Sequence, residues 1–468
     1  MKIYYNGQYK IKDKSGKESI YNNIYNIRDY ENKITEIEVE EGTVEIKDRA
    51  FYKCKSLEKI TLPKSLQLIG ADAFSGCSSL TEVDIPKKVW KIKERAFSSC
   101  TKLKKIKIPN QIRTIEKMTF WKCNFESVIL PNNLKSIEYA AFSDCFSLKE
   151  INLPKTVTKI DKSAFHWCRS LEKIVIPDNV KIIDEKTFEG CSSLKEIIFP
   201  KELEEIGLQA FGNCESLKEI ILPKNVSTIG IKAFEFCTSL EKIVFPENIT
   251  KIEFEAFSCC ESLKEVEIPK KITELSNGVF YNCKSLTSVS IPDNITKIGD
   301  CTFSKCIGLH NVVFNNPNVK LKFNSFGKCD NLDPELKEKI YYNVVKNVKY
   351  DDIKFFFEVY NIEYSSEIIQ DLMSINAVFF ASAKKEDKEV FLEAALDSIN
   401  NKHINGSEFI IKTDLCNIII YDEKIFISPV DEDYNQRAPF NPSNMETYKL
   451  SKRIFNIEKI YKEKELNI

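Results

Sequence analysis

Apolar residues recur along most of this chain with a period of about 23 residues, and a fixed period of this kind predicts a solenoid, in which each unit stacks on the next. A phenylalanine marks each period. Successive copies are equally spaced except between Phe120 and Phe142, where the interval is one residue shorter. The marking residues are Phe51, Phe74, Phe97, Phe120, Phe142, Phe165, Phe188, Phe211, Phe234, Phe257, Phe280, Phe303 and Phe326.

One period, from Cys77 to Cys100, shows what each unit contributes. The alternation of Val83 and Ile85 around one polar residue predicts a short strand, and Pro86 ends that strand because proline cannot donate to the ladder. A single unit has too little apolar surface to fold alone, so we expect the units to stack. In several units a glycine follows a later isoleucine, which suggests a left-handed turn; these are Gly70, Gly207, Gly230 and Gly299.

The consensus L-x-x-I-x-L-P-x-x-V-x-x-I-G-x-x-A-F-x-x-C resembles the BspA-type leucine-rich repeat. The resemblance extends over roughly residues 34 to 332. It implies a β-rich leucine-rich-repeat solenoid. For many exported members of that family it also implies adhesion or binding to host surfaces.

Thirteen of the sixteen cysteines occupy one slot of the repeat, three residues after each marking phenylalanine. A small, weakly polar side chain suits a stacked interior, so we interpret this ladder as packing. Metal sites need ligands clustered at short spacings, and we expect neither metal nor cofactor. Unpaired cysteines favour a reducing compartment. Cys259, Cys301 and Cys416 lie outside the ladder.

The two ends of the chain differ from the repeats. We expect residues 1–33 to form an irregular cap with a turn at KDKSGKE, and residues 34–332 to form the solenoid. Residues 333–468 have lost the period and predict a small α+β domain. In it we expect several amphipathic helices, two strands around a turn at Asp422-Glu423, and a final helix near Tyr448 to Lys464.

Hydropathy indicates where the protein is located, and charge indicates which partners it can bind. The sequence shows no secretory signal and no apolar run of about 20 residues, so we expect a cytoplasmic protein, with the cell surface or non-classical secretion as the alternative. The net charge is −1. Residues 333–468 carry 18 basic and 25 acidic side chains, a net −7, which leaves +6 for residues 1–332. This imbalance is too diffuse to predict nucleic-acid binding.

The sequence offers little that resembles a catalytic site. The three histidines, His166, His310 and His403, lie in no recognisable motif. His166 lies near Cys168, but that cysteine belongs to the ladder. We therefore predict a non-enzymatic protein-interaction scaffold. The alternatives are a surface adhesin of the BspA type, or a targeting module for an unrecognised enzymatic or effector domain at the C-terminus.

Outward positions of the predicted strands are where a protein partner would bind. Most of these positions are polar, but four consecutive units carry aliphatic residues: Val175, Ile198, Ile221 and Val244. We expect them to form an apolar stripe on the concave face. Three explanations remain open, namely binding of a separate partner, cover by the C-terminal domain, and the preference of β-branched residues for strands.

Aromatic residues near the cysteine slot form a second candidate surface, because tryptophan and tyrosine are common binding anchors. Some of these side chains would instead pack between neighbouring loops. The residues are Trp121, Phe146, His166, Trp167, Phe236 and Tyr281.

Overall fold

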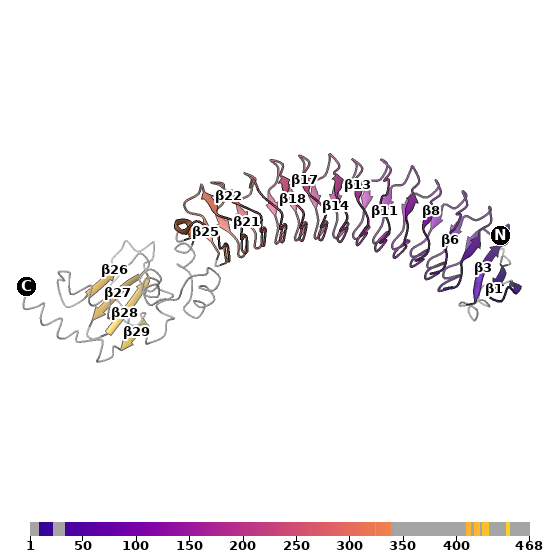
Figure 1. Ribbon diagram of the computed structural model, residues 1–468, viewed down its shortest axis with the longest axis horizontal. Coiled ribbons are helices and arrows are strands. Elements are labelled where there is room, and N and C mark those ends of the chain that lie inside the picture. Colours follow the sequence, from indigo (N-terminus) through magenta and orange to yellow (C-terminus); the bar gives the residue numbers. More distant parts are fainter. Residues whose placement is uncertain are drawn as a thin grey trace, which may run out of the picture. The chain divides into compact units, whose positions relative to one another are not determined.

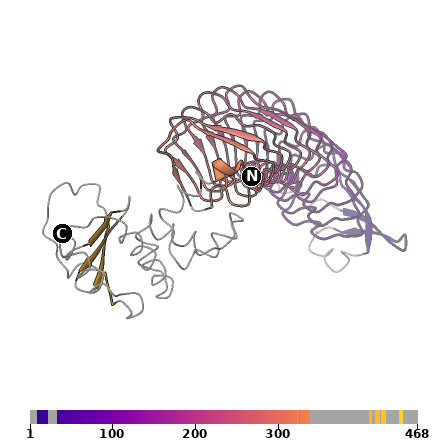
Figure 2. The ribbon, with the colours of Figure 1, turned by 60° about the vertical axis from the view of Figure 1, so that its left-hand side comes forward.

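The computed structural model describes residues 9–21, 33–322, 324–337 and 340, and four strands near the C-terminus at 409–412, 416–421, 424–429 and 446–449. The chain divides into two compact units, Met1–Val319 and Lys320–Ile468. The first unit is a β-solenoid whose turns follow one another along an arc (Figure 1) and nest closely (Figure 2). Each turn of the solenoid corresponds to one period of the sequence and is called a rung below.

Most rungs contribute a short strand to a first ladder, as the alternation predicts, whereas the rungs of Val83, Ile151 and Val266 contribute only isolated bridges. The central residue points inward and its neighbours point outward, and strands pair in parallel with a shift of one period, so that Ile174 lies beside Ile197. The strands are β3 (Ile34–Val39), β5 (Lys59–Thr61), β8 (Lys105–Lys107), β10 (Ser127–Ile129), β13 (Lys173–Val175), β15 (Glu196–Ile198), β17 (Glu219–Ile221), β19 (Lys242–Val244), β22 (Ser288–Ile291) and β24 (Asn311–Phe314).

A second ladder of two-residue strands runs along the same rungs, and the sequence did not predict it. Each of these strands ends on the buried isoleucine or leucine that precedes the glycine slot. They are β4 (Glu45–Ile46), β6 (Leu68–Ile69), β7 (Lys91–Ile92), β9 (Thr114–Ile115), β11 (Ser136–Ile137), β12 (Lys159–Ile160), β14 (Ile182–Ile183), β16 (Glu205–Ile206), β18 (Thr228–Ile229), β20 (Lys251–Ile252), β21 (Glu274–Leu275) and β23 (Lys297–Ile298).

The marking phenylalanines stack along the interior. From Phe51 to Phe303 the ring centroids of neighbours are 5.1 to 5.9 Å apart, and the rings are nearly parallel. These rings are fully buried. The stack is therefore a continuous core that each rung extends by one ring.

The cysteine ladder is buried beside this stack, and its thiols make a specific contact. From Cys77 to Cys306, each Sγ donates to the carbonyl oxygen of the phenylalanine one rung earlier, at 3.1 to 3.5 Å. Burial raises the thiol pKa, to about 12 for Cys123 and Cys237. The thiols thus link successive rungs as weak hydrogen-bond donors, in addition to filling space.

The left-handed positions of the backbone lie elsewhere than the glycines suggested, so that prediction was wrong. Left-handed φ values occur just before the cysteine slot, as at Lys53 (60°) and Trp167 (56°), and two residues before the phenylalanines from Phe51 to Phe303, as at Arg95 (54°). Gly70 instead allows a close approach between rungs. A Cβ atom there would lie 2.5 Å from the backbone nitrogen of Asp48.

One rung is shorter than the others, and its missing residue lies in a single segment. Between Cys123 and Val128 the chain has one residue fewer than the previous rung has between Cys100 and Ile106. Phe125 is buried in this segment and packs edge-on to Phe120, with centroids 5.4 Å apart. The parallel pairing of β8 with β10 continues across this rung, with Val128 beside Ile106.

The N-terminal cap is a β-hairpin, which corrects the expectation of an irregular cap. β1 (Tyr9–Asp13) and β2 (Glu18–Tyr21) pair antiparallel around the predicted turn, and β1 also pairs with β3. The buried Tyr9 packs edge-on to Phe51 at 5.8 Å. The hairpin therefore covers the first ring of the phenylalanine stack.

The second unit begins with β25 (Lys320–Leu321) and contains a four-stranded antiparallel sheet. Its order is β26 (Phe409–Lys412), β27 (Cys416–Tyr421), β28 (Lys424–Pro429) and β29 (Glu446–Lys449). β27 and β28 pair antiparallel on either side of residues 422–423, and the predicted turn itself lies outside the described residues. One strand more than expected precedes this turn, and β29 occupies the start of the expected final helix. The other predicted helices lie largely outside the described residues.

Candidate interaction surface

The outward positions of the first ladder are exposed on every rung from Thr61 to Val313, as the alternation predicts. Four of them on neighbouring rungs form the apolar stripe. Their exposed fractions are 48% for Val175, 45% for Ile198, 62% for Ile221 and 40% for Val244. Pairing places Val175 beside Ile198 and Ile221 beside Val244. The apolar stripe is thus a contiguous row of half-exposed aliphatic side chains.

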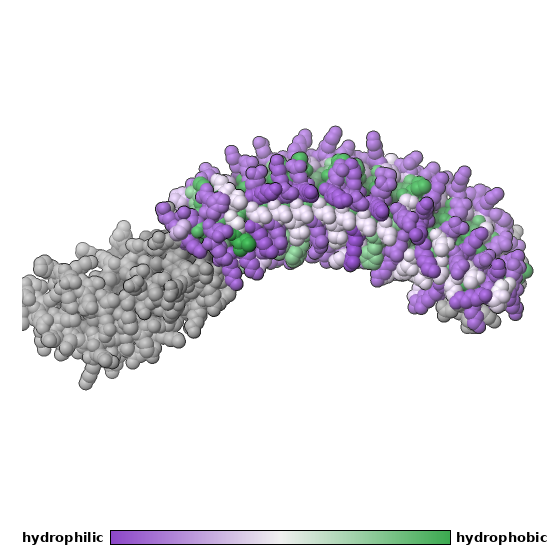
Figure 3. Space-filling model, viewed as in Figure 1, coloured by the Kyte–Doolittle hydropathy of each residue, from purple (hydrophilic) through white to green (hydrophobic). Residues whose placement is uncertain are grey.

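Charged side chains surround the apolar stripe and pair between rungs. Lys173 lies 2.7 Å from Glu196, and Lys195 lies 2.9 Å from Glu172. All of these groups are about half exposed, so each pair contributes only about 0–1 kcal/mol. Figure 3 shows the same texture on the displayed face of the solenoid, where small apolar patches lie among hydrophilic residues. These charged side chains make the surface around the apolar stripe hydrophilic.

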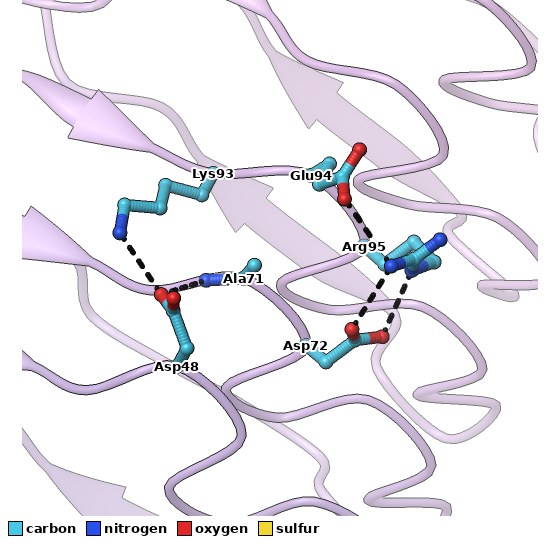
Figure 4. A network of polar contacts seen from close by, with 6 residues as sticks. All are labelled: Asp48, Ala71, Asp72, Lys93, Glu94 and Arg95. Carbon is cyan, nitrogen blue, oxygen red and sulfur yellow. Dashed lines mark hydrogen bonds and ion pairs between the residues drawn. The ribbon is translucent and has the colours of Figure 1, made fainter.

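Polar side chains also link the rungs, and Figure 4 shows one network of such contacts. Nζ of Lys93 lies 2.9 Å from Oδ1 of Asp48, which also accepts a hydrogen bond from the Ala71 backbone at 2.8 Å. Arg95 forms a bidentate pair with Asp72 at 3.0 and 3.2 Å. Burial acts to raise the pKa of the Asp48 carboxyl, but Lys93 and the Ala71 amide lower it on balance. These contacts stiffen the solenoid rather than form a site.

The candidate aromatic surface falls partly between loops. Trp121 donates through Nε1 to Asp144 Oδ2 at 2.8 Å, with Lys122 over its ring. The guanidinium of Arg169 lies between Phe146 and Trp167, at 5.0 and 4.7 Å from the ring centroids. The Trp167 ring also rests on Gly190, where an added Cβ would lie 2.7 Å from Cδ2.

The exposure of these aromatic residues divides them into two groups. Trp121, His166, Trp167 and Tyr281 are half-buried, whereas Phe146 and Phe236 are exposed. The half-buried group therefore fits the expectation that some of the aromatic residues pack between loops.

Ser143, His166 and Glu189 occupy one slot on three successive rungs. Nδ1 of His166 lies 3.5 Å from Ser143 Oγ, and Nε2 lies 3.4 Å from Glu189 Oε2. The Ser143 hydroxyl is buried and donates to Asp144 at 3.0 Å, so this row does not present a nucleophile to a substrate. Although burial acts to raise it, the pKa of Glu189 is lowered on balance by His166 and by Lys186.

Among the residues that the structure describes, no three histidine, cysteine or acidic side chains gather as metal ligands. Within the same part of the chain, no helix is long and apolar enough to cross a bilayer. The acidic segment from Asp431 to Tyr434, whose carboxylates could ligate a cation, lies outside the described residues.

A model of the BspA type leucine rich repeat region matches residues 18–128, 113–234 and 204–333. Together these matches cover more than half of the 468 residues. The repeat, the parallel ladders and the stacked interior agree with this match. The chain belongs to the BspA-type leucine-rich repeat family.

Solved structures of bacterial leucine-rich repeat proteins are similar to this chain. A leucine-rich repeat protein from Bacteroides ovatus is 28% identical, over 58% of this chain and 82% of that one, with a TM-score of 0.43. A leucine rich cell surface protein from Faecalibacterium prausnitzii is 27% identical, over 62% and 81%, with a TM-score of 0.44. The pneumococcal vaccine antigen PcpA is 21% identical, over 67% and 83%, with a TM-score of 0.44. No curated protein matches the chain.

Proposed function

We propose that this protein is a non-enzymatic interaction protein of the adhesin type, which binds a protein partner through the apolar stripe. The exposure of four neighbouring aliphatic side chains, from Val175 to Val244, is the observation that supports this proposal most. A contiguous exposed apolar patch more often marks a contact surface than a single exposed residue does. The concave face, on which we expected this contact, stays a prediction.

The preference of β-branched residues for strands explains the apolar stripe less well than binding of a partner does. Ile129 and Val313 are also outward and exposed, but Ile129 lies between Lys107 and Asn152, and Val313 follows Ser290 at the end of the ladder. Isolated residues of this kind are normal on protein surfaces. The four residues of the stripe are consecutive, and their contiguity is what a partner could use.

A location at the cell surface suits this function better than the cytoplasm that we expected. A cytoplasmic location was expected because unpaired cysteines favour a reducing compartment. The ladder thiols are buried and their pKa values are raised, as for Cys100 and Cys168. Because the thiolate is the reactive form, such thiols stay reduced in either compartment. The family resemblance, with adhesion in many exported members, supports the surface.

The aromatic surface is a second candidate for contact with a protein partner. Phe236 is exposed, whereas Trp121, His166 and Trp167 are half-buried and held by neighbours. Side chains that are fixed in this way lose little entropy on binding. An effector role for the C-terminal unit remains the other alternative, and it concerns residues outside the described ones.

Paired substitutions test the apolar stripe. The full chain with Ile198→Asp and Ile221→Asp should lose protein partners that the wild type captures, while its thermal unfolding stays nearly unchanged. A matched control carries Ile182→Asp and Ile231→Asp, which are also exposed isoleucines but lie outside the stripe. Equal capture by all three chains would remove the stripe as the contact surface. Stronger capture by a chain cut after residue 332 would indicate cover by the C-terminal unit.

A further inference from the structure

Two columns of charged residues border the strands of the middle rungs. The columns span six rungs, namely the four of the apolar stripe and the two that flank it, which carry Asn152 and Glu267 at the stripe position. The first column holds the outward residue two positions before the stripe position. Its members are Glu150, Lys173, Glu196, Glu219, Lys242 and Glu265. The second column holds the residue three positions after the stripe, just past the proline. Its members are Lys155, Asp178, Lys201, Lys224, Glu247 and Lys270. All twelve are exposed.

On each of these six rungs the two columns carry opposite charges. Rung by rung, the first column reads −, +, −, −, +, − and the second reads +, −, +, +, −, +. The two residues of one rung are five positions apart, up to about 16 Å along an extended chain. Ion pairs within a rung therefore do not explain why the two columns carry opposite charges.

Contacts between rungs do not explain the pattern either. Lys173 pairs with Glu196 at 2.7 Å, and Lys242 lies 3.9 Å from Glu219. At the centre, however, Glu196 and Glu219 follow each other on neighbouring rungs of the first column. Lys201 and Lys224 do the same in the second column. Like charges on neighbouring strands repel, so both columns have unfavourable neighbours at the middle of the stripe.

We propose that the apolar stripe binds the same stripe of a second copy of this chain, with a two-fold axis parallel to the stack of rungs. This inference rests on the proposed function, because it uses the stripe as the contact surface. The axis places each rung against the same rung of the second copy and exchanges the two columns. Glu196 and Glu219 then face Lys201 and Lys224 of the second copy. On the other four rungs the first column of one copy also faces residues of opposite charge in the second column of the other.

The charges select this arrangement over the other face-to-face one. A two-fold axis across the stack reverses the order of rungs and sets the first column against itself. Lys173 would then face Lys242, and Glu196 would face Glu219, so that every contact of the stripe's rim would join like charges. Like charges at an interface cost several kcal/mol. The parallel arrangement alone turns all of these contacts into opposite pairs.

The size of the surface predicts a weak dimer. Six rungs about 4.8 Å apart and a width of about 16 Å give a footprint of roughly 400 Å² on each copy. This area is below that of standard stable complexes. We therefore expect a reversible dimer whose fraction rises with protein concentration and falls with salt.

Sedimentation of the full chain over a concentration series, at low and high salt, tests this proposal. Ile198→Asp with Ile221→Asp should abolish the dimer. Glu196→Lys with Glu219→Lys should weaken it about tenfold or more, because both rims of the dimer then join like charges. Lys201→Glu with Lys224→Glu should weaken it similarly.

Swapping the charges of the two columns by substitution tests specifically for binding of a second copy. A chain with all four rim substitutions should form the dimer again, because its columns are reversed together. Mixing the two double variants should yield a heterodimer although each alone is monomeric. The matched control is Glu205→Lys with Glu274→Lys, which makes the same change in net charge on the second ladder.

The outcomes separate this inference from the proposed function. A wild-type chain that stays monomeric throughout, while the aspartate pair still loses capture of another protein, overturns the second copy and leaves the stripe as a contact surface. A dimer that none of the stripe or rim variants weakens overturns the inference. Failure of the four-substitution chain to recover also overturns it, provided that its circular dichroism and thermal unfolding match the wild type.

Discussion

Lys93 and Asp48 form an ion pair of 2.9 Å although a whole rung separates them. The rung between them has Gly70 in the slot that Lys93 occupies on its own rung, so no side chain stands between the two charges. The same glycine lies so close to the preceding rung that a Cβ would be 2.5 Å from the Asp48 nitrogen. The glycine thus serves spacing and pairing rather than a turn.

Gly70→Ala should lower the free energy of unfolding by about 1–3 kcal/mol, because the backbone of Asp48 must move to admit the methyl group. Urea denaturation measures the change. Lys93→Ala is the control, since it removes only the exposed ion pair and should cost about 0–1 kcal/mol. Equal stability of the two variants would show that the close approach is easily relaxed.

Gly190→Ala should cost more than Gly76→Ala, although both glycines have left-handed φ values of 74° and 80°. Each substitution incurs about 1–2 kcal/mol for the left-handed backbone. At Gly190 the new Cβ also lies 2.7 Å from the Trp167 ring, whereas at Gly76 it meets the flexible Lys53 side chain at 3.2 Å. Unfolding free energies give the difference, and a shift in tryptophan fluorescence should accompany Gly190→Ala only.

The ladder thiols should resist alkylation in the native protein at pH 8. Cys123 is buried and its pKa is raised to about 12, so little thiolate forms and reagents reach it only on unfolding. Cys301 is half-buried and outside the ladder, and should react faster. Peptide mass spectrometry after timed labelling compares the two. Native labelling of Cys123 at the rate of Cys301 would contradict a closed interior.

Glu189→Gln should destabilise the protein at pH 7 by about 1–3 kcal/mol, because the carboxylate lies 3.2 Å from Lys186 and 3.4 Å from His166. The pKa of Glu189 is lower in the folded chain than its ordinary value of 4.5. Its contribution is therefore complete above that value and is lost as the pH falls through the folded pKa.

Unfolding of both chains from pH 7 to pH 3 checks this sign. The difference between wild type and Glu189→Gln should shrink only below about pH 4.5. Glu204→Gln, which removes an exposed pair with Lys181, is the control and should cost little at any pH. A difference that persists unchanged to pH 3 would show that the charge of Glu189 is not its cause.

The period made most of the solenoid predictable, because every rung has residues at the positions equivalent to Phe74, Cys77 and Val83. The second ladder escaped prediction because a strand such as Lys91–Ile92 leaves only one apolar residue as its signal. The left-handed positions escaped because residues as different as Lys53 and Trp167 share one slot with Gly76 and Gly190, so that composition gives only a weak signal. Gly70 suggested a turn from the sequence. Glycine is needed there because the neighbouring rung lies so close, and this distance cannot be read from the sequence.

The exposed positions of the candidate site were predictable, since alternation along a strand fixes which side chains point outward. Val175 and Ile221 are exposed for that reason. Which of the aromatic residues pack between loops was not predictable, because the burial of Trp121 and Trp167 depends on Asp144 and Gly190, each on the next rung. The thiol contact with the phenylalanine carbonyl was also missed, since Cys77 and Phe51 lie more than a full period apart and backbone acceptors leave no mark in a sequence.

The short rung shows where this architecture can change in length during evolution. The missing residue near Phe125 changed neither the parallel pairing of β10 with β8 nor the order of the aromatic stack, because an edge-on ring replaced the usual leucine. Insertions and deletions should therefore accumulate in the segment that follows the cysteine. Relatives of this protein would then differ in that one margin of the solenoid while the surfaces built on the strands keep their spacing, so that a binding face can be inherited intact by chains of unequal length.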